Sequence, residues 1–184
     1  MMDSTLKNKT SKQLLWVGMA GITMLFAGLT SAYIVRKAEG NWLQFEMPNW
    51  FWFSTVSIVI CSALLHISKI VVKNGKSPVV FLIGALFLGL FFSFSQIMGW
   101  QKLVSDGVYF TGKGSNPAGS FLYVITLVHL LHLIGGLVSL TITSIKATRG
   151  KYTSEDYLGI ELNTIYWHFL DLLWLYLFFF MMYI

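Results

Sequence analysis

The chain has 184 residues, of which 55% are hydrophobic, 16% aromatic and 11% charged, whereas about 25% of the residues of an average soluble domain are charged. The net charge of +5 is spread over several short segments, which argues against a nucleic-acid-binding surface. A single cysteine, Cys61, excludes a secreted scaffold held by disulfides. This composition predicts an integral membrane protein.

Five stretches are long and apolar enough to cross a bilayer core of about 30 Å as helices. In chain order they are residues 14–35, 50–72, 78–100, 118–145 and 163–184. Together they contain only two charged residues, Lys69 and Asp171. We therefore predict an all-α fold, a single membrane domain of five transmembrane helices over residues 14–184. Residues 1–13 are predicted to form an N-terminal tail, and the intervening loops are too short to hold a soluble catalytic domain.

The loops differ in their content of lysine and arginine, which is higher on the cytoplasmic side of a membrane protein. The richer side comprises the N-terminus and the segments around the ends of the second and fourth stretches, with Lys7, Lys9, Lys12, Lys69, Lys73, Lys76, Lys146, Arg149 and Lys151. The other side has Arg36, Lys37, Lys102 and Lys113. We predict a cytoplasmic N-terminus and, after five crossings, a C-terminus on the outside.

Polar side chains recur at helical spacing in the last two stretches. One face of the fourth stretch carries His129, His132, Gly136, Ser139 and Thr143, and one face of the fifth carries Glu161, Thr164, His168 and Asp171. Ionisable groups at membrane depth are costly and almost always face a partner in the bundle. One interpretation is that the imidazoles of one face hydrogen-bond the carboxylates of the other and fix the register of the two helices.

A metal site is the alternative interpretation of the same residues. His129, His132, His168 and Asp171 could in principle ligate a metal ion. The spacing is unspecific, and a membrane di-iron oxygenase would have many more histidines than the four of this chain. His66 lies near Lys69 in sequence and is predicted to be interfacial. We expect no bound metal and no catalytic nucleophile, and a histidine-dependent membrane metalloenzyme remains the rival hypothesis.

Three motifs resemble cytochrome c oxidase subunit III. Residues 166–176, YWHFLDLLWLY, look like the signature YWHFVDVVWLF of that family's last helix. Residues 129–136, HLLHLIGG, resemble its HGLHVxxG motif, and residues 26–36, FAGLTSAYIVR, are similar to its FAGLxxAYxxxR. Glu161 stands five residues before Tyr166, where the family also has a glutamate. The resemblance extends from about Leu14 to the C-terminus, and its motif residues include Gly28, Arg36, Gly136, Tyr166, Trp167 and Trp174.

The resemblance implies a subunit of a haem–copper terminal oxidase that itself holds neither haem nor copper. Subunit III of that family packs beside subunits I and II, binds phospholipids and supports proton uptake. The chain looks like the shorter five-helix bacterial form, which implies a multi-pass protein of the bacterial plasma membrane. Subunit III of a quinol oxidase and the related accessory protein of nitric oxide reductases remain alternatives within the family.

Two further positions follow from the resemblance. The family has a basic residue at the position of Lys146 that meets a lipid phosphate, so Lys146 and Arg149 are candidates for binding a phospholipid headgroup. Alternatively, both residues only mark the cytoplasmic side. Many family members have an acidic residue where this chain has Ile22. A proton-related role of that carboxylate therefore cannot be transferred to this chain.

Overall fold

The computed structural model describes residues 4–183, which form five helices and the loops between them. The helices are α1 (Ser4–Ala38), α2 (Asn49–Lys73), α3 (Val79–Ser105), α4 (Pro117–Thr148) and α5 (Leu158–Tyr183). All five are long and apolar enough to cross a membrane. The prediction of an all-α, five-helix membrane fold is confirmed. The orientation of the chain in the membrane stays a prediction.

The helices extend beyond the predicted spans at several ends. Helix α1 begins at Ser4, so the described part of the predicted N-terminal tail is helical. Helix α5 begins at Leu158 and has Glu161 in its first turn. Helix α4 begins after Asn116, whose side chain accepts a hydrogen bond from the backbone N–H of Ala118, with Pro117 in the first turn. The polar ends of these helices lie outside the apolar runs that hydropathy detects.

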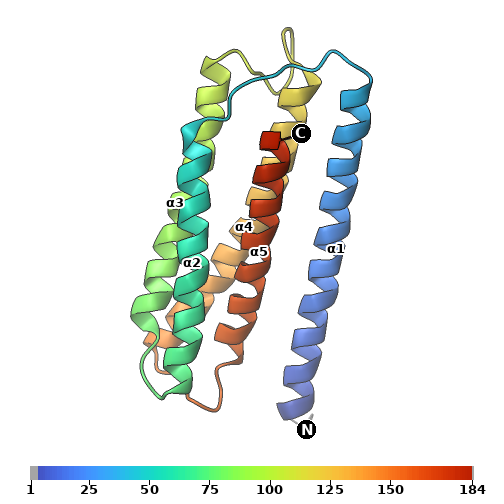
Figure 1. The fold of residues 1–184 in the computed structure, drawn as a ribbon. Coiled ribbons are helices and arrows are strands. Elements are labelled where there is room, and N and C mark those ends of the chain that lie inside the picture. The colour runs from blue at the N-terminus through green and yellow to red at the C-terminus, as the bar shows by residue number, and fades with distance from the viewer. Residues whose placement is uncertain (1–3, 184) are drawn as a thin grey trace.

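Helices α2 and α3 form a hairpin, and α5 packs against α2, α4 and α1 near the centre of the bundle (Figure 1). Helix α3 also packs against α4. Helix α1 contacts α4 and α5 but not α2, and it stands to one side of the bundle (Figure 1). We call the end of the bundle at which α1 begins the inner end, because it is the end predicted to face the cytoplasm.

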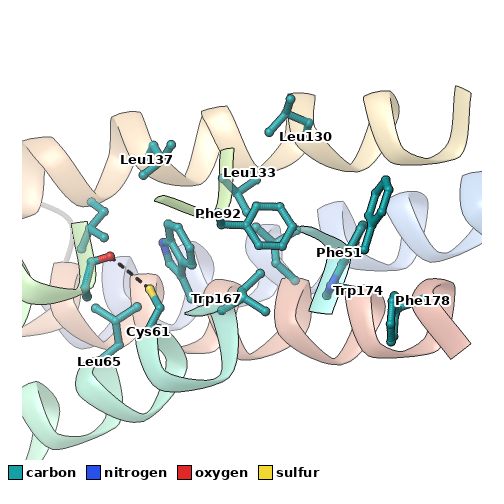
Figure 2. Close-up of a cluster of buried hydrophobic side chains, with 14 of the residues drawn as sticks. Phe51, Cys61, Leu65, Phe92, Leu130, Leu133, Leu137, Trp167, Trp174 and Phe178 are labelled. Carbon is teal, nitrogen blue, oxygen red and sulfur yellow. Dashed lines mark hydrogen bonds between the residues drawn. The ribbon is translucent and has the colours of Figure 1, made fainter. Parts of the chain in front are cut away.

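Two tryptophans of α5 occupy the centre of the core (Figure 2). Trp167 is fully buried and packs against Gly89 of α3 and Gly136 of α4, and a Cβ added at Gly89 would collide with its ring. Trp174 is also fully buried, and its ring stacks on Phe51 of α2. Because glycine lets neighbouring helices approach closely, the two glycines make room for Trp167.

Hydrogen bonds between side chains join the helices inside the bundle. Trp174 donates to the hydroxyl of Thr55 at 2.9 Å, which links α5 to α2. Gln96 of α3 donates to Ser54 of α2 at 2.9 Å, and the Cys61 thiol donates to the Ala85 carbonyl. Such bonds contribute about 0.6 kcal/mol each on average in a membrane bundle. They fix the rotation of helices whose faces are almost uniformly apolar.

Helix α1 is attached mainly through aromatic side chains. Phe26 and Tyr33 are buried against α4 and α5, and the Tyr33 ring meets Phe180 edge-on at 5.1 Å. The hydroxyl of Tyr176 on α5 donates to Thr30 of α1 at 3.1 Å. These contacts lie in the outer two thirds of α1, so its inner third needs another attachment.

Candidate functional site

His129 lies fully buried among aromatic rings from three other helices. Its ring centroid is 5.1 Å from that of Trp174 on α5, 5.8 Å from Phe92 on α3 and 6.3 Å from Phe26 on α1. Neither ring nitrogen has a hydrogen-bond partner among the described residues. An imidazole N–H over an aromatic face makes a weak favourable contact. His129 is thus a packing residue at a point where four helices meet.

His132 lies one turn further along α4 and bonds within its own helix. Its Nδ1 is 2.8 Å from the carbonyl of Val128, and its ring lies beside Phe26 of α1. The carbonyl of His132 accepts a hydrogen bond from the Tyr166 hydroxyl of α5 at 3.0 Å. Tyr166 also covers Gly136, so these residues join α4 to α5 through packing and one backbone acceptor.

The interpretation that imidazoles of α4 pair with carboxylates of α5 is wrong. Within residues 4–183, no hydrogen bond or ion pair joins His129 or His132 to Glu161 or Asp171. The physical reason is the rotation of α5, which turns its polar face toward α2 rather than α4. Accordingly, Nδ1 of His168 bonds to the hydroxyl of Ser62 on α2.

Glu161 forms an ion-pair cluster at the inner end of the bundle. Its two carboxylate oxygens lie 2.6 Å from the ammonium group of Lys12 on α1 and 3.2 Å from that of Lys69 on α2. The side chain of Glu161 is 19% exposed, so solvent only partly screens these pairs. One carboxylate therefore ties three helices together and supplies the missing attachment of the inner third of α1.

Asp171 lies deeper along the same face of α5. It is 9% exposed, and its carboxyl group lies close to Ser62. One of its oxygens has no protein partner. Ser62 therefore stands between the imidazole of His168 and the carboxyl group of Asp171. A hydroxyl in this position can accept a proton from one neighbour and donate to the other.

The other motif residues and the two lipid-binding candidates differ in their burial and contacts. Arg36 pairs with Glu39 at 3.1 Å at the outer end of α1, and Gly28 is exposed with open space around it. Ile22 is partly buried against the aromatic contacts of α1. Lys146 and Arg149 are exposed at the inner end of α4. Trp167 and Trp174, described above, are the core of the α5 motif.

The described residues hold no group of three or more His, Cys, Asp or Glu side chains that could bind one metal ion. The imidazoles diverge: His129 is enclosed by aromatic rings, His132 bonds to its own helix and His168 bonds to Ser62. Copper sites in proteins are commonly built from several imidazole or thiolate ligands at one point, whereas among the described residues these three imidazoles have separate partners.

The partners that α2 supplies to α5 were not predicted from the sequence. Ser62, His66 and Lys69 follow one another at i, i+4 and i+7 and share one face of α2. The His66 ring lies 5.7 Å from that of His168, centroid to centroid. This spacing is visible in the sequence, but it becomes informative only when α2 is known to lie beside α5.

Comparison with known proteins places the chain in a family. The family model described as Cytochrome c oxidase subunit III matches residues 54–184. A protein of Nocardia farcinica named Probable cytochrome c oxidase subunit 3 is 30% identical over 170 residues, covering 84% of this chain and 78% of that protein. A protein of the same name from Mycobacterium leprae is 28% identical over 168 residues, covering 88% and 82%. The cytochrome c oxidase subunit 3 of Tetraodon nigroviridis is 36% identical over 96 residues, covering 50% of this chain and 33% of its own length.

The match extends over the structural features described above. It includes the polar face shared by α2 and α5, His129 with Phe92 and Trp174, and the α5 motif, whereas α1, the loop after it and the start of α2 lie outside the matched residues. The full-length bacterial relatives extend the similarity into the remaining part of the chain. This protein belongs to the cytochrome c oxidase subunit III family.

Proposed function

We propose that this chain is the non-redox subunit III of a haem–copper terminal oxidase of the cytochrome c oxidase type, in the plasma membrane of a bacterium. The family match over residues 54–184 is the observation that carries the proposal. The chain packs against oxidase subunit I, with subunit II in the same complex. Electrons reach oxygen through haem and copper held by those partners, and proton translocation is coupled to that reaction.

Two structural features support a role without redox chemistry in this chain. His129 is enclosed by aromatic rings, His132 bonds to its own helix, and His168 bonds to Ser62 with His66 as its neighbouring imidazole. The helices also leave large apolar side chains exposed along α1 and α3, such as Met24 at 77%, Val80 at 78% and Phe87 at 69%. Membrane lipids or the helices of neighbouring subunits can cover such surfaces. The chain thus supports the catalytic subunit rather than replacing any part of it.

This supporting role includes sustained turnover and proton uptake by subunit I. We expect an oxidase purified from cells that lack this chain to start at a similar rate of oxygen consumption but to lose activity sooner during turnover. Adding the chain back should restore the lifetime. The measurement is oxygen consumption over time by the two preparations at equal haem content. Identical lifetimes with and without the chain would contradict the supporting role.

A phospholipid bound at the inner end of α4 belongs to the same proposal. Lys146 and Arg149 are exposed at the end of this helix, where ammonium and guanidinium groups can pair with a headgroup phosphate. We expect the double substitution Lys146→Gln with Arg149→Gln to lower the amount of phospholipid that remains after extensive detergent washing. Phosphorus analysis of the washed protein provides the measurement.

The matched control for this substitution replaces Lys102 and Lys113, exposed cations at the opposite end of the bundle, by glutamine. That variant should retain lipid as the wild type does. If the Lys146/Arg149 variant keeps its phospholipid and the oxidase keeps its turnover lifetime, the two residues serve only to orient the chain in the membrane.

A further inference from the structure

A row of ionisable and hydroxyl side chains follows the interface of α2 and α5 from the inner end into the membrane. Helix α2 contributes Lys69, His66 and Ser62, and helix α5 contributes Glu161, His168 and Asp171. At a rise of 1.5 Å per residue, Asp171 lies about 15 Å deeper than Glu161. Polar groups at such depth are expensive and mark functional sites by default. We call this row the α2–α5 polar track.

Three polar side chains lie close together at the deep end of the α2–α5 polar track. Ser62 is buried, bonds to Nδ1 of His168 and lies beside the carboxyl group of Asp171. Asp171 is nine-tenths buried, and one of its oxygens has no protein partner. Neither an arginine nor a lysine pairs with it among the described residues. A carboxylate buried without a cation is stabilised by accepting a proton.

The shallow end of the track opens to the surface of the bundle. His66 is exposed, and its ring centroid is 5.7 Å from that of His168, a separation that one water molecule can bridge. His66 lies about 10 Å along α2 from Lys73, the last residue of the helix. Beside it, Glu161 is partly exposed between Lys12 and Lys69. An imidazole between a charged surface cluster and a buried chain can pass protons in both directions.

We propose that Asp171 is a proton-exchange site inside the membrane, connected to the inner surface through His66, His168 and Ser62. His66 takes up a proton from water at the inner surface and passes one proton to Nε2 of His168. The Nδ1–H of His168 then donates its proton to Ser62 Oγ while the Ser62 hydroxyl proton passes to the Asp171 carboxylate. The result is one neutralised carboxylate, with no net change in the number of protons on either imidazole or on the hydroxyl. His168 ends in the opposite tautomer, and return of the proton by the same route resets it.

Other titratable groups near Asp171 have separate environments. On α2, Cys61 lies close to Asp171, but its thiol donates to the Ala85 carbonyl. On α4, His129 is enclosed by aromatic rings and His132 bonds to the Val128 carbonyl. On α1, Lys12 faces Glu161 at the mouth of the track. His168 and Ser62 are therefore the groups through which a proton can reach Asp171.

Time-resolved infrared spectroscopy on the full chain in lipid nanodiscs tests the proposal. The carboxyl band of Asp171 is identified as the band that Asp171→Asn removes, and its rise is followed after light releases protons from a caged compound. We expect Ser62→Ala and His168→Phe each to slow this rise about 100-fold or more, since a positioned proton-transfer group typically contributes about 10²–10⁴-fold. Ser62→Thr keeps a hydroxyl and should retain the wild-type rate. His132→Phe, an imidazole outside the track, should also leave the rate unchanged.

His66→Phe tests the same route in a variant that should fold normally, because His66 is exposed and its replacement does not disturb the core. It should slow the rise in the same way as His168→Phe. Equal rates in the wild type, Ser62→Ala and His66→Phe would overturn the proposal, as would the absence of any band that responds to Asp171→Asn. The experiment needs only this chain, so either result leaves its assignment as an oxidase subunit untouched.

Discussion

Replacing Trp174 by alanine is expected to lower the free energy of unfolding of the chain by about 3–5 kcal/mol, as for other buried large aromatic side chains. Trp174 is fully buried, and its ring contacts Phe51, Phe92 and His129 from three other helices. The substitution also removes the donor to Thr55. The measurement is reversible unfolding in mixed detergent micelles, followed by circular dichroism. Leu172→Ala is the matched control, since Leu172 lies two residues away on the same helix and is 67% exposed.

Trp174→Phe separates the two contributions of this residue. It keeps a ring in the core and loses the hydrogen bond to Thr55, so its effect should be clearly smaller than that of Trp174→Ala. If Trp174→Ala unfolds at the same denaturant concentration as Leu172→Ala, the central position of Trp174 in the core is wrong.

A methyl group added at Gly89 is expected to destabilise the bundle by about 1–3 kcal/mol, the usual cost of overpacking a core. The added Cβ would lie 2.7 Å from the Trp167 ring and 2.8 Å from a methyl carbon of Leu137. Both neighbours are held inside the core, so α3 must move away from α4 and α5. In an ordinary lipid-facing helix the same change is favourable, because alanine is the better helix former.

Gly135→Ala tests that contrast on a neighbouring helix. A Cβ at Gly135 meets nothing within 4 Å, so this variant should be as stable as the wild type or slightly more stable. Unfolding of Gly89→Ala, Gly135→Ala and the wild type in the same detergent is the comparison. Equal stability of the two alanine variants would contradict the close packing of α3 against Trp167.

The five helices could be predicted from the sequence because apolar runs of sufficient length are almost free of charge. The ends of the helices could not, since Ser4 to Lys12 is helical but polar, and Glu161 interrupts the apolar run near the start of α5. The rotation of each helix about its own axis could not be predicted from the sequence either. Lipid-facing and core-facing side chains are both apolar in a bilayer, so periodicity does not distinguish them.

The polar residues of the candidate site were found, but their partners were not. His168 and Asp171 were singled out on α5 from the sequence, whereas their neighbour Ser62 lies on α2, more than one hundred residues earlier in the chain. Ser139, placed by spacing on the polar face of α4, is exposed instead of buried with His129. Only the packing of α5 between α2 and α4 decides which face meets which neighbour.

The family motif is largely a packing motif in this structure. The contacts of α5 with α4, α3 and α2 are made largely by Tyr166, Trp167 and Trp174. The polar side of α5 toward α2 is formed by His168 and Asp171. A sequence motif can therefore identify the family through residues whose observed contacts are mostly packing contacts between helices.

Purification of the affinity-tagged chain from its native membranes in a mild detergent tests the central claim most directly. We expect it to co-purify with a haem- and copper-containing subunit that reduces oxygen, whereas the chain produced alone should hold no stoichiometric iron, copper or zinc. Elemental analysis and the haem spectrum of both preparations provide the measurement. A chain that purifies without such a partner and holds a stoichiometric metal ion, lost in His132→Ala, would contradict the account and favour a metalloenzyme.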